Sequence, residues 1–201
     1  YSTELDTALQ NVKNADPSFS LKLLAFDACL MAMAEVAYMV RNHAEIFVAS
    51  QEAAEDTGYD YTTAFAALIN NPGEVKAIDL ANSLIASYQQ QHQGDRRGWD
   101  TLSATSTSAL NTLVTSIKTF TDAAVALTSN ATWDAIKDAR DFANSFYPAP
   151  YYRDLGQFLQ AVATSTNSNL PANLKPAANN ALTALRNLVV DKTADQRNVQ
   201  G

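Results

Sequence analysis

Cys29 is the only cysteine among the 201 residues, and Asp27 lies two positions before it. A cysteine at the junction between a strand and a helix can be a nucleophile, because backbone N–H groups and the helix dipole there stabilise a thiolate. A free cysteine more often serves as a small buried apolar residue, which is the alternative interpretation. Asp27 is poorly suited to activating the thiol, since a carboxylate disfavours a second negative charge nearby, and is better suited to anchoring a substrate cation.

The elements around Cys29 form a βαβ pattern. Residues 21–26 (LKLLAF) have the length and composition of a buried strand, and residues 30–40 carry apolar side chains at helical spacing. Residues 45–50 (EIFVAS) predict a second strand, parallel to the first. Because ligands bind at the carboxyl ends of such strands, Cys29 and the acidic loop at residues 51–61 should share one edge of the sheet.

The remaining sequence is predominantly helical. Residues 102–107 predict one further short strand. Apolar periodicity and breaker residues predict helices over residues 74–91, 108–127, 133–146, 154–163 and 176–190. With 47% hydrophobic residues, the chain can bury the core of one domain over residues 1–201.

The charge balance argues against nucleic acid as a partner. Fourteen basic and 21 acidic side chains give a net charge of -7, which opposes affinity for phosphate backbones. Arg96 and Arg97, the only adjacent basic pair, lie in a polar run and are interpreted as a solvated loop or a secondary processing site. No apolar run has the roughly 20 residues needed to span a bilayer. The polar surface composition and a start at Tyr1 without methionine favour a processed, extracytoplasmic protein.

The segment FDACLMAMAEVAYMVRNHAEIFVASQE, followed by TGYDY, resembles the clostripain-like cysteine peptidases, of the same clan as caspases, gingipains and legumain. LANSLIASYQQQH, TLSATSTSAL and YYRDLGQFLQ extend the similarity over most of the chain. The resemblance implies a caspase-like α/β sandwich with a central, mostly parallel sheet and added helices. It further implies cleavage of peptide bonds after arginine or lysine, with no required cofactor.

By position, the resemblance assigns roles to the residues around Cys29. Cys29 matches the nucleophile, whose backbone N–H contributes to the oxyanion hole, and Asp27 matches an acidic residue of the S1 pocket, with Ala28 between them. A second S1 carboxylate is expected from the loop after the next strand, where Asp56 gives the best alignment. Asp60 and Glu55 remain open.

The family's catalytic histidine lies upstream of the cysteine, and no histidine precedes Cys29 here. His43 and His92 do not match the family position and are interpreted as ordinary surface residues. The resemblance therefore implies that this chain is the larger product of autoprocessing. A companion N-terminal chain would supply the histidine and the first strands of the sheet, which residues 1–201 lack.

Two rival functions remain. The acidic loop, with Glu52, Glu55, Asp56 and Asp60, offers oxygen ligands of the kind that calcium prefers, so a non-catalytic module binding calcium or a basic protein is one alternative. Some clostripain-like enzymes also depend on calcium, so the ion alone does not separate the two. A degenerate scaffold of the same fold is the other alternative. A reactive thiol distinguishes the peptidase from both.

Overall fold

The computed structural model describes residues 2–92 and 101–192, and the chain divides into two compact units. The first comprises the residues up to 108 together with the strand that begins at 189, and the second comprises residues 109–188. Arg96 and Arg97 lie outside the described residues. One domain over residues 1–201 stays a prediction.

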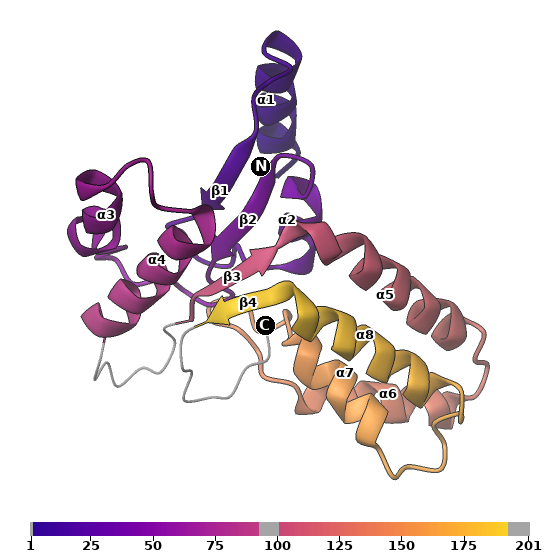
Figure 1. Cartoon of the computed structure of the whole chain (residues 1–201). Helices are drawn as coiled ribbons and strands as arrows, with labels where there is room; N and C mark the ends of the chain where they lie inside the picture. The colour runs from indigo at the N-terminus through magenta and orange to yellow at the C-terminus, as the bar shows by residue number, and fades with distance from the viewer. Residues whose placement is uncertain (1, 93–100, 193–201) are drawn as a thin grey trace. The chain divides into compact units, whose positions relative to one another are not determined.

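A four-stranded sheet forms the centre of the first unit, in the order β1-β2-β3-β4 (Figure 1). Its strands are β1 (Leu21–Ala25), β2 (Ala44–Ala49), β3 (Ser103–Ser106) and β4 (Val189–Lys192). The strands predicted over residues 21–26, 45–50 and 102–107 are therefore confirmed, as is the α/β fold class. Val189 and Val190, expected at the end of a helix, instead open β4, where their branched side chains suit the pleat.

The pairing in the sheet is mixed. β1 and β2 are parallel, with Leu23 opposite Ile46, as the βαβ pattern predicted. The pairings of β2 with β3 and of β3 with β4 are antiparallel, so the described part of the sheet differs from the mostly parallel one expected. The physical reason is the connectivity: a crossover helix joins β1 to β2, whereas β3 enters the sheet in the opposite direction.

Helix α2 (Ala34–Val40) is shorter than the predicted helix over residues 30–40. Leu30 has a φ of 58°, in the left-handed region, and Met33 is extended, so the chain cannot be α-helical before Ala34. Cys29 consequently lies in a loop rather than at the first turn of a helix. The expected help of the helix dipole for its thiolate was wrong.

Helices α3 (Tyr61–Asn70) and α4 (Ala77–Gln91) pack with the sheet around an apolar cluster. Ile46 and Val48 of β2 belong to this cluster, and the intervening Phe47 points to the opposite face because side chains alternate along a strand. α4 begins three residues after the predicted start, since Lys76 is extended and its N–H donates to the Asp79 carboxylate at 3.1 Å.

Helix α1 (Ser2–Ala15) was not predicted, and it explains an error about His43. His43 is only 6% exposed, and its Nε2 lies 2.7 Å from Oδ1 of Asp6 on α1. The interpretation of His43 as a surface residue was therefore wrong, because a partner 37 positions away in sequence covers it.

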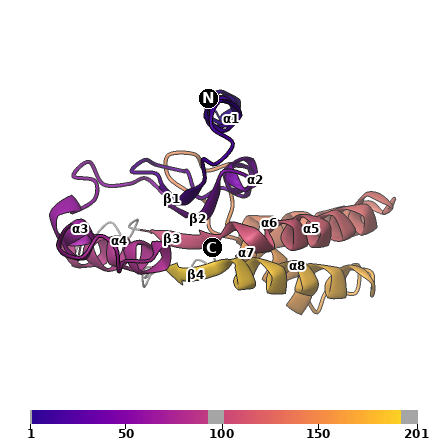
Figure 2. The ribbon, with the colours of Figure 1, turned by 45° about the horizontal axis from the view of Figure 1, so that its top comes forward.

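The second unit is helical throughout its regular structure. It contains α5 (Leu110–Val125), α6 (Asn130–Phe142), α7 (Leu155–Thr164) and α8 (Leu174–Leu188), close to the predicted ranges. α8 packs against both α5 and α7 (Figures 1 and 2), with Leu159, Leu174 and Ala178 among the buried residues of their common core.

Asp154 is the N-cap residue of α7 in the second unit. Its side chain is buried and its Oδ1 accepts a hydrogen bond of 2.7 Å from the backbone N–H of Gln157 in the first turn of α7. We expect Asp154→Ala to lower the free energy of unfolding by roughly 1–2 kcal/mol, as measured by urea denaturation. Asp154→Asn keeps a capping oxygen and should lose less than half as much; an equal loss in both variants would contradict the capping role.

Candidate active site

Cys29 lies in the loop that follows β1, with an exposed side chain. Its Sγ accepts a hydrogen bond of 3.2 Å from the backbone N–H of Ala54 and lies 3.9 Å from the carbonyl oxygen of the same residue. The interpretation of Cys29 as a small buried apolar residue was therefore wrong. An exposed thiol in a loop at the carboxyl end of a strand is accessible to a substrate.

Backbone hydrogen bonds join the loop after β1, which carries Cys29, to the loop after β2. The N–H groups of Leu30 and Ala32 donate to the carbonyl oxygens of Glu52 and Ser50, at 2.9 and 2.8 Å. Leu30 holds its left-handed φ in this arrangement, which costs a leucine roughly 1–2 kcal/mol. The loop after β2 thus fixes the path of the chain directly after Cys29.

A hydroxyl pair anchors the second of these loops. Ser50 Oγ forms a hydrogen bond of 3.0 Å with Thr101 Oγ1, and the same Ser50 oxygen accepts from the N–H of Glu52 at 3.1 Å. All three residues are buried. Glu52, which the sequence offered as one of four acidic oxygen ligands in this loop, is fully buried.

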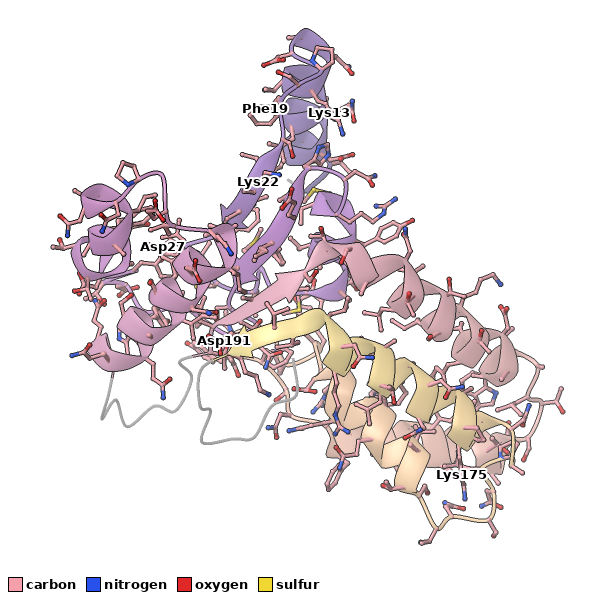
Figure 3. All side chains as sticks on the ribbon, viewed as in Figure 1. Lys13, Phe19, Lys22, Asp27, Lys175 and Asp191 are labelled. Carbon is pink, nitrogen blue, oxygen red and sulfur yellow. The ribbon has the colours of Figure 1, made fainter. Side chains whose placement is uncertain are left out.

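Asp27, which Figure 3 labels, has its carboxylate held by residues that follow β2. Oδ2 accepts hydrogen bonds from the Tyr59 N–H at 3.2 Å and from the Tyr61 hydroxyl at 2.8 Å. Gly58 has a φ of 63°, and a Cβ there would lie 2.4 Å from the same oxygen. Only glycine allows the backbone to approach this closely. Asp27 and Ala28 remain exposed.

The pKa values of Tyr59 and Tyr61 are both raised by their surroundings, including the charge of Asp27. The hydrogen bond to Asp27 raises the pKa of Tyr61, and desolvation and the carboxylate's charge act in the same direction. Burial, followed by the charge of Asp27, raises the pKa of Tyr59, whose hydroxyl donates to the Phe26 carbonyl oxygen at 2.7 Å. Both tyrosines therefore stay neutral donors at physiological pH. The TGYDY segment gave no local signal of this role for its two tyrosines.

The acidic residues of the loop differ in their environments. Asp60 is the N-cap of α3: its Oδ1 accepts from the Thr63 N–H at 3.1 Å, and hydrogen bonds to Thr63 hold its pKa below the usual range. Asp56 is exposed in the turn that the Gly58 N–H closes on the Glu55 carbonyl oxygen at 2.9 Å. Asp56 thus keeps a solvent-facing side chain, whereas Asp60 has a structural role.

Asp27 borders a cavity of about 950 Å³ within the first unit. Most of its lining is apolar or aromatic and comes from β1, β2, α3 and α4. The lining includes Leu23, Ala25, Ile46, Tyr59, Tyr61, Phe65, Leu68, Val75, Ile78 and Leu84. The cavity is mostly apolar and is bordered by two carboxylates, Asp27 and Glu45, and by two lysines, Lys22 and Lys76, so it suits a ligand with an apolar stem and a charged end.

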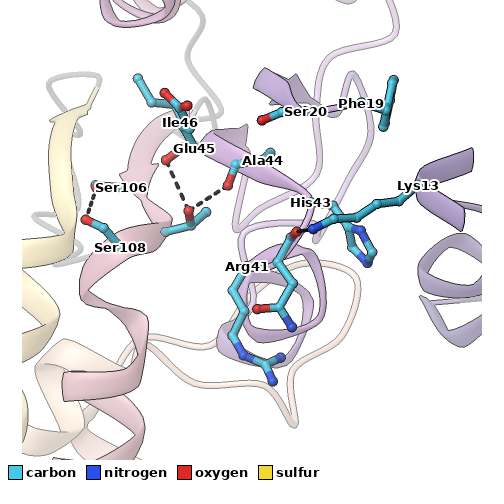
Figure 4. A pocket seen from close by; sticks show the side chains of 12 residues that line it. Lys13, Phe19, Ser20, Arg41, His43, Ala44, Glu45, Ile46, Ser106 and Ser108 are labelled. Atoms are coloured by element: carbon cyan, nitrogen blue, oxygen red, sulfur yellow. Dashed lines mark hydrogen bonds between the residues drawn. The ribbon is translucent and has the colours of Figure 1, made fainter. Parts of the chain in front are cut away.

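A second cavity, of about 480 Å³, lies around the segment before β2 and contains neither Cys29 nor Asp27 (Figure 4). Its two basic residues already have partners. Lys13 Nζ donates to the Asn42 carbonyl oxygen at 3.4 Å, and the Arg41 guanidinium stacks over the Tyr38 ring at 3.5 Å from its centroid. The first contact links α1 to the turn before β2, and the second lies within α2 and its C-cap residue.

The histidines stay apart from the thiol. Within residues 2–92 and 101–192, the hydrogen bonds of the Cys29 sulfur are those to Ala54. His92 packs its ring 4.5 Å from that of Tyr88, and its Nε2 is buried, so it is not the surface residue expected from sequence. Neither histidine is in place to act as a base for Cys29.

Among residues 2–92 and 101–192 there is no group of three or more His, Cys, Asp or Glu side chains placed to hold a metal ion. The described helices are too short or too polar for a membrane-spanning segment.

The exposed thiol, the nearby carboxylate and the parallel β1–β2 pair fit the protein family whose sequence profile matches this chain. The profile of the clostripain family matches residues 1–200. The chain belongs to the clostripain family. The resemblance seen in the sequence is thereby confirmed, and the α/β fold is the one found in this family's solved structures. No curated protein sequence matches the chain.

Solved cysteine proteases share the fold. A clostripain from Bacteroides thetaiotaomicron, in complex with the peptide inhibitor BTN-VLTK-AOMK, has a TM-score of 0.62 at 18% identity, covering 93% of this chain and 73% of its own. A B. fragilis cysteine protease has a TM-score of 0.61 at 19% identity, covering 100% of this chain and 82% of its own. A secreted C11 cysteine protease from Bacteroides thetaiotaomicron, bound to an irreversible peptide inhibitor, has a TM-score of 0.60 at 22% identity, covering 96% of this chain and 48% of its own.

The close approach of Gly58 to Asp27 predicts that a side chain at position 58 destabilises the fold. We expect Gly58→Ala to lower the free energy of unfolding by roughly 1–2 kcal/mol from the left-handed φ alone, and more from the clash with the carboxylate. Gly73→Ala is the matched control, because a Cβ there meets nothing within 4 Å. It should be neutral or stabilising by up to about 1 kcal/mol. Equal unfolding curves for the two variants would contradict the close approach.

The raised pKa of Tyr59 predicts how the free energy of unfolding changes at alkaline pH. Its folded pKa is raised, so its contribution is fully present below the unfolded value of about 10 and is lost as pH rises from there toward the folded value. We expect the free energy of unfolding to fall more steeply above pH 10 in the wild type than in Tyr59→Phe. Urea denaturation between about pH 8 and 11 measures both. Parallel curves would show that Tyr59 ionises equally in the two states.

Proposed function

We propose that this chain is the cysteine-bearing part of an endopeptidase that cleaves peptide bonds after arginine or lysine. The observation that carries the proposal is that an exposed thiol, Cys29, and an exposed carboxylate, Asp27, lie in one loop, and that Asp27 borders a mostly apolar cavity. Membership of the clostripain family supports protease chemistry.

In the proposed reaction, the Cys29 thiolate attacks the scissile carbonyl carbon. The C–N bond breaks as the S–C bond of a thioester forms, and the leaving amine takes up the proton that the base removed from the Cys29 thiol. Water then attacks the thioester carbon, the S–C bond breaks, and the carboxylic acid leaves as a proton of the water passes through the base to the sulfur and restores the thiol. The Cys29 backbone N–H is proposed as an oxyanion donor, since it belongs to the nucleophile's own residue.

Asp27 is proposed to pair with the substrate's basic side chain. Its charge is offset by two hydrogen bonds to Oδ2, yet the side chain remains accessible. Ala28, which separates the acid from the nucleophile, leaves room for the substrate. Asp56 is proposed as the second carboxylate, because it is exposed, whereas Asp60 is engaged in capping α3.

The base for the reaction is proposed to be a histidine of a companion N-terminal chain separated by autoprocessing. β1 is the terminal strand in the order of the described strands, so its outer edge offers backbone groups to a further strand from that chain. No cofactor is required by the proposed chemistry, with calcium as an accessory ion. An extracytoplasmic location is part of the proposal, and one structural neighbour is a secreted protease.

Substituting the nucleophile tests the proposal. The full precursor, with its upstream segment, is assayed on fluorogenic peptides ending in arginine, lysine or aspartate. We expect turnover after arginine or lysine in the wild type and a loss of at least about 10³-fold in Cys29→Ala. Mass spectrometry of the same samples should show a cut upstream of the described chain only where Cys29 is intact.

The alternatives predict a different result. A calcium- or protein-binding module, or a degenerate scaffold, would show no turnover and a thiol that resists iodoacetamide. Cleavage after aspartate alone would contradict the role of Asp27, because a carboxylate repels an acidic side chain.

A further inference from the structure

The two oxygens of the Asp27 carboxylate differ in how many hydrogen bonds they accept. Oδ2 accepts from the Tyr61 hydroxyl at 2.8 Å and from the Tyr59 N–H at 3.2 Å, which engages both of its lone-pair directions. Among the described residues, none donates a hydrogen bond to Oδ1. The carboxylate thus presents one open oxygen to an incoming cation.

The donors on Oδ2 are held rigidly. The Tyr61 ring packs on Phe65 at 6.0 Å between centroids and lies edge-on to Tyr59 at 5.9 Å. The Tyr59 N–H is fixed by the turn at Gly58, whose backbone lies so close that a Cβ would be 2.4 Å from Oδ2 and 3.1 Å from Oδ1. An incoming side chain therefore cannot easily displace the donors from Oδ2.

A single open oxygen affects lysine and arginine differently. A guanidinium binds a carboxylate best through two parallel N–H bonds, one to each oxygen. An ammonium is a compact point charge that needs only one acceptor oxygen and can rotate its remaining donors toward water. Where Oδ2 is already engaged, arginine loses its bidentate contact, whereas lysine loses little.

The cavity beside Asp27 fits the same ligand. Its apolar lining can hold the methylene stem of a lysine, with the ammonium group at the carboxylate. Two basic residues, Lys22 and Lys76, also line the cavity. Lys22 is paired with Glu45, which reduces the repulsion that it would exert on an entering cation.

We propose that Tyr61 is a positioning residue that makes the site prefer lysine over arginine at the residue before the cleaved bond. The proposal rests on the proposed function, since it assigns a preference within the same S1 pocket. By holding Oδ2 through its hydroxyl, Tyr61 acts on the substrate only through Asp27. Removing that hydroxyl frees one lone pair of Oδ2 and restores a second contact for arginine.

The test compares two fluorogenic peptides that differ only in lysine or arginine before the cleaved bond, with the activated full-length protein. In the wild type, we expect kcat/KM for the lysine peptide to exceed that for the arginine peptide by roughly tenfold, the size of one charge-assisted hydrogen bond. In Tyr61→Phe, the ratio should fall severalfold. The change should come from a lower KM for the arginine peptide at similar kcat, because ground-state binding is what improves.

Tyr38→Phe is the matched control: it removes a tyrosine hydroxyl from α2, away from Asp27, and should leave the ratio unchanged. Cleavage of both peptides with a wild-type ratio at or below one would overturn this inference and leave the proposed function standing. A ratio that Tyr61→Phe does not change would also overturn it. No cleavage of either peptide would overturn the proposed function itself, together with the preference built on it.

Discussion

The hydrogen bonds between the loop after β1 and the loop after β2 are the interaction on which the site depends. The parallel pairing of the two strands brings their carboxyl ends to one edge of the sheet, and backbone hydrogen bonds from Leu30 to Glu52 and from Ala32 to Ser50 join the two loops beyond those ends. As a result, the segment with the nucleophile cannot move independently of the acidic loop. The thiol, its backbone donor at Ala54 and the Asp27 carboxylate are positioned by the same few contacts.

Several buried polar groups in this region have hydrogen-bond partners, which limits the cost of burying them. The Ser50 and Thr101 hydroxyls are hydrogen-bonded to each other in the interior, and Ser50 Oγ also accepts from the Glu52 N–H. The Tyr59 hydroxyl donates to the Phe26 carbonyl oxygen, and its backbone N–H donates to Asp27. Tyr59 therefore contributes both to the stability of the loop and to the position of the Asp27 carboxylate.

The aspartates have different roles because their local hydrogen-bond partners differ. Asp60 and Asp154 cap helices in the first and second units, and each accepts from a backbone N–H in the first turn. Asp27 accepts from two tyrosines on one oxygen and leaves the other open. Asp56 stays in solvent. Four aspartates thus have three different roles.

The sequence by itself determined the strand–loop–helix–strand order around Cys29, the parallel pairing of the first two strands and the family, because apolar periodicity and the residues near Cys29 are local signals. It also pointed to Asp27 as a cation anchor, since a carboxylate two positions from a thiol has few other uses. Only the tertiary structure decided that Cys29 lies in a loop, that His43 is buried against α1, and that Tyr59 and Tyr61 hold Asp27. These features depend on partners 25 to 37 positions away in sequence, and no local pattern encodes a contact over that distance.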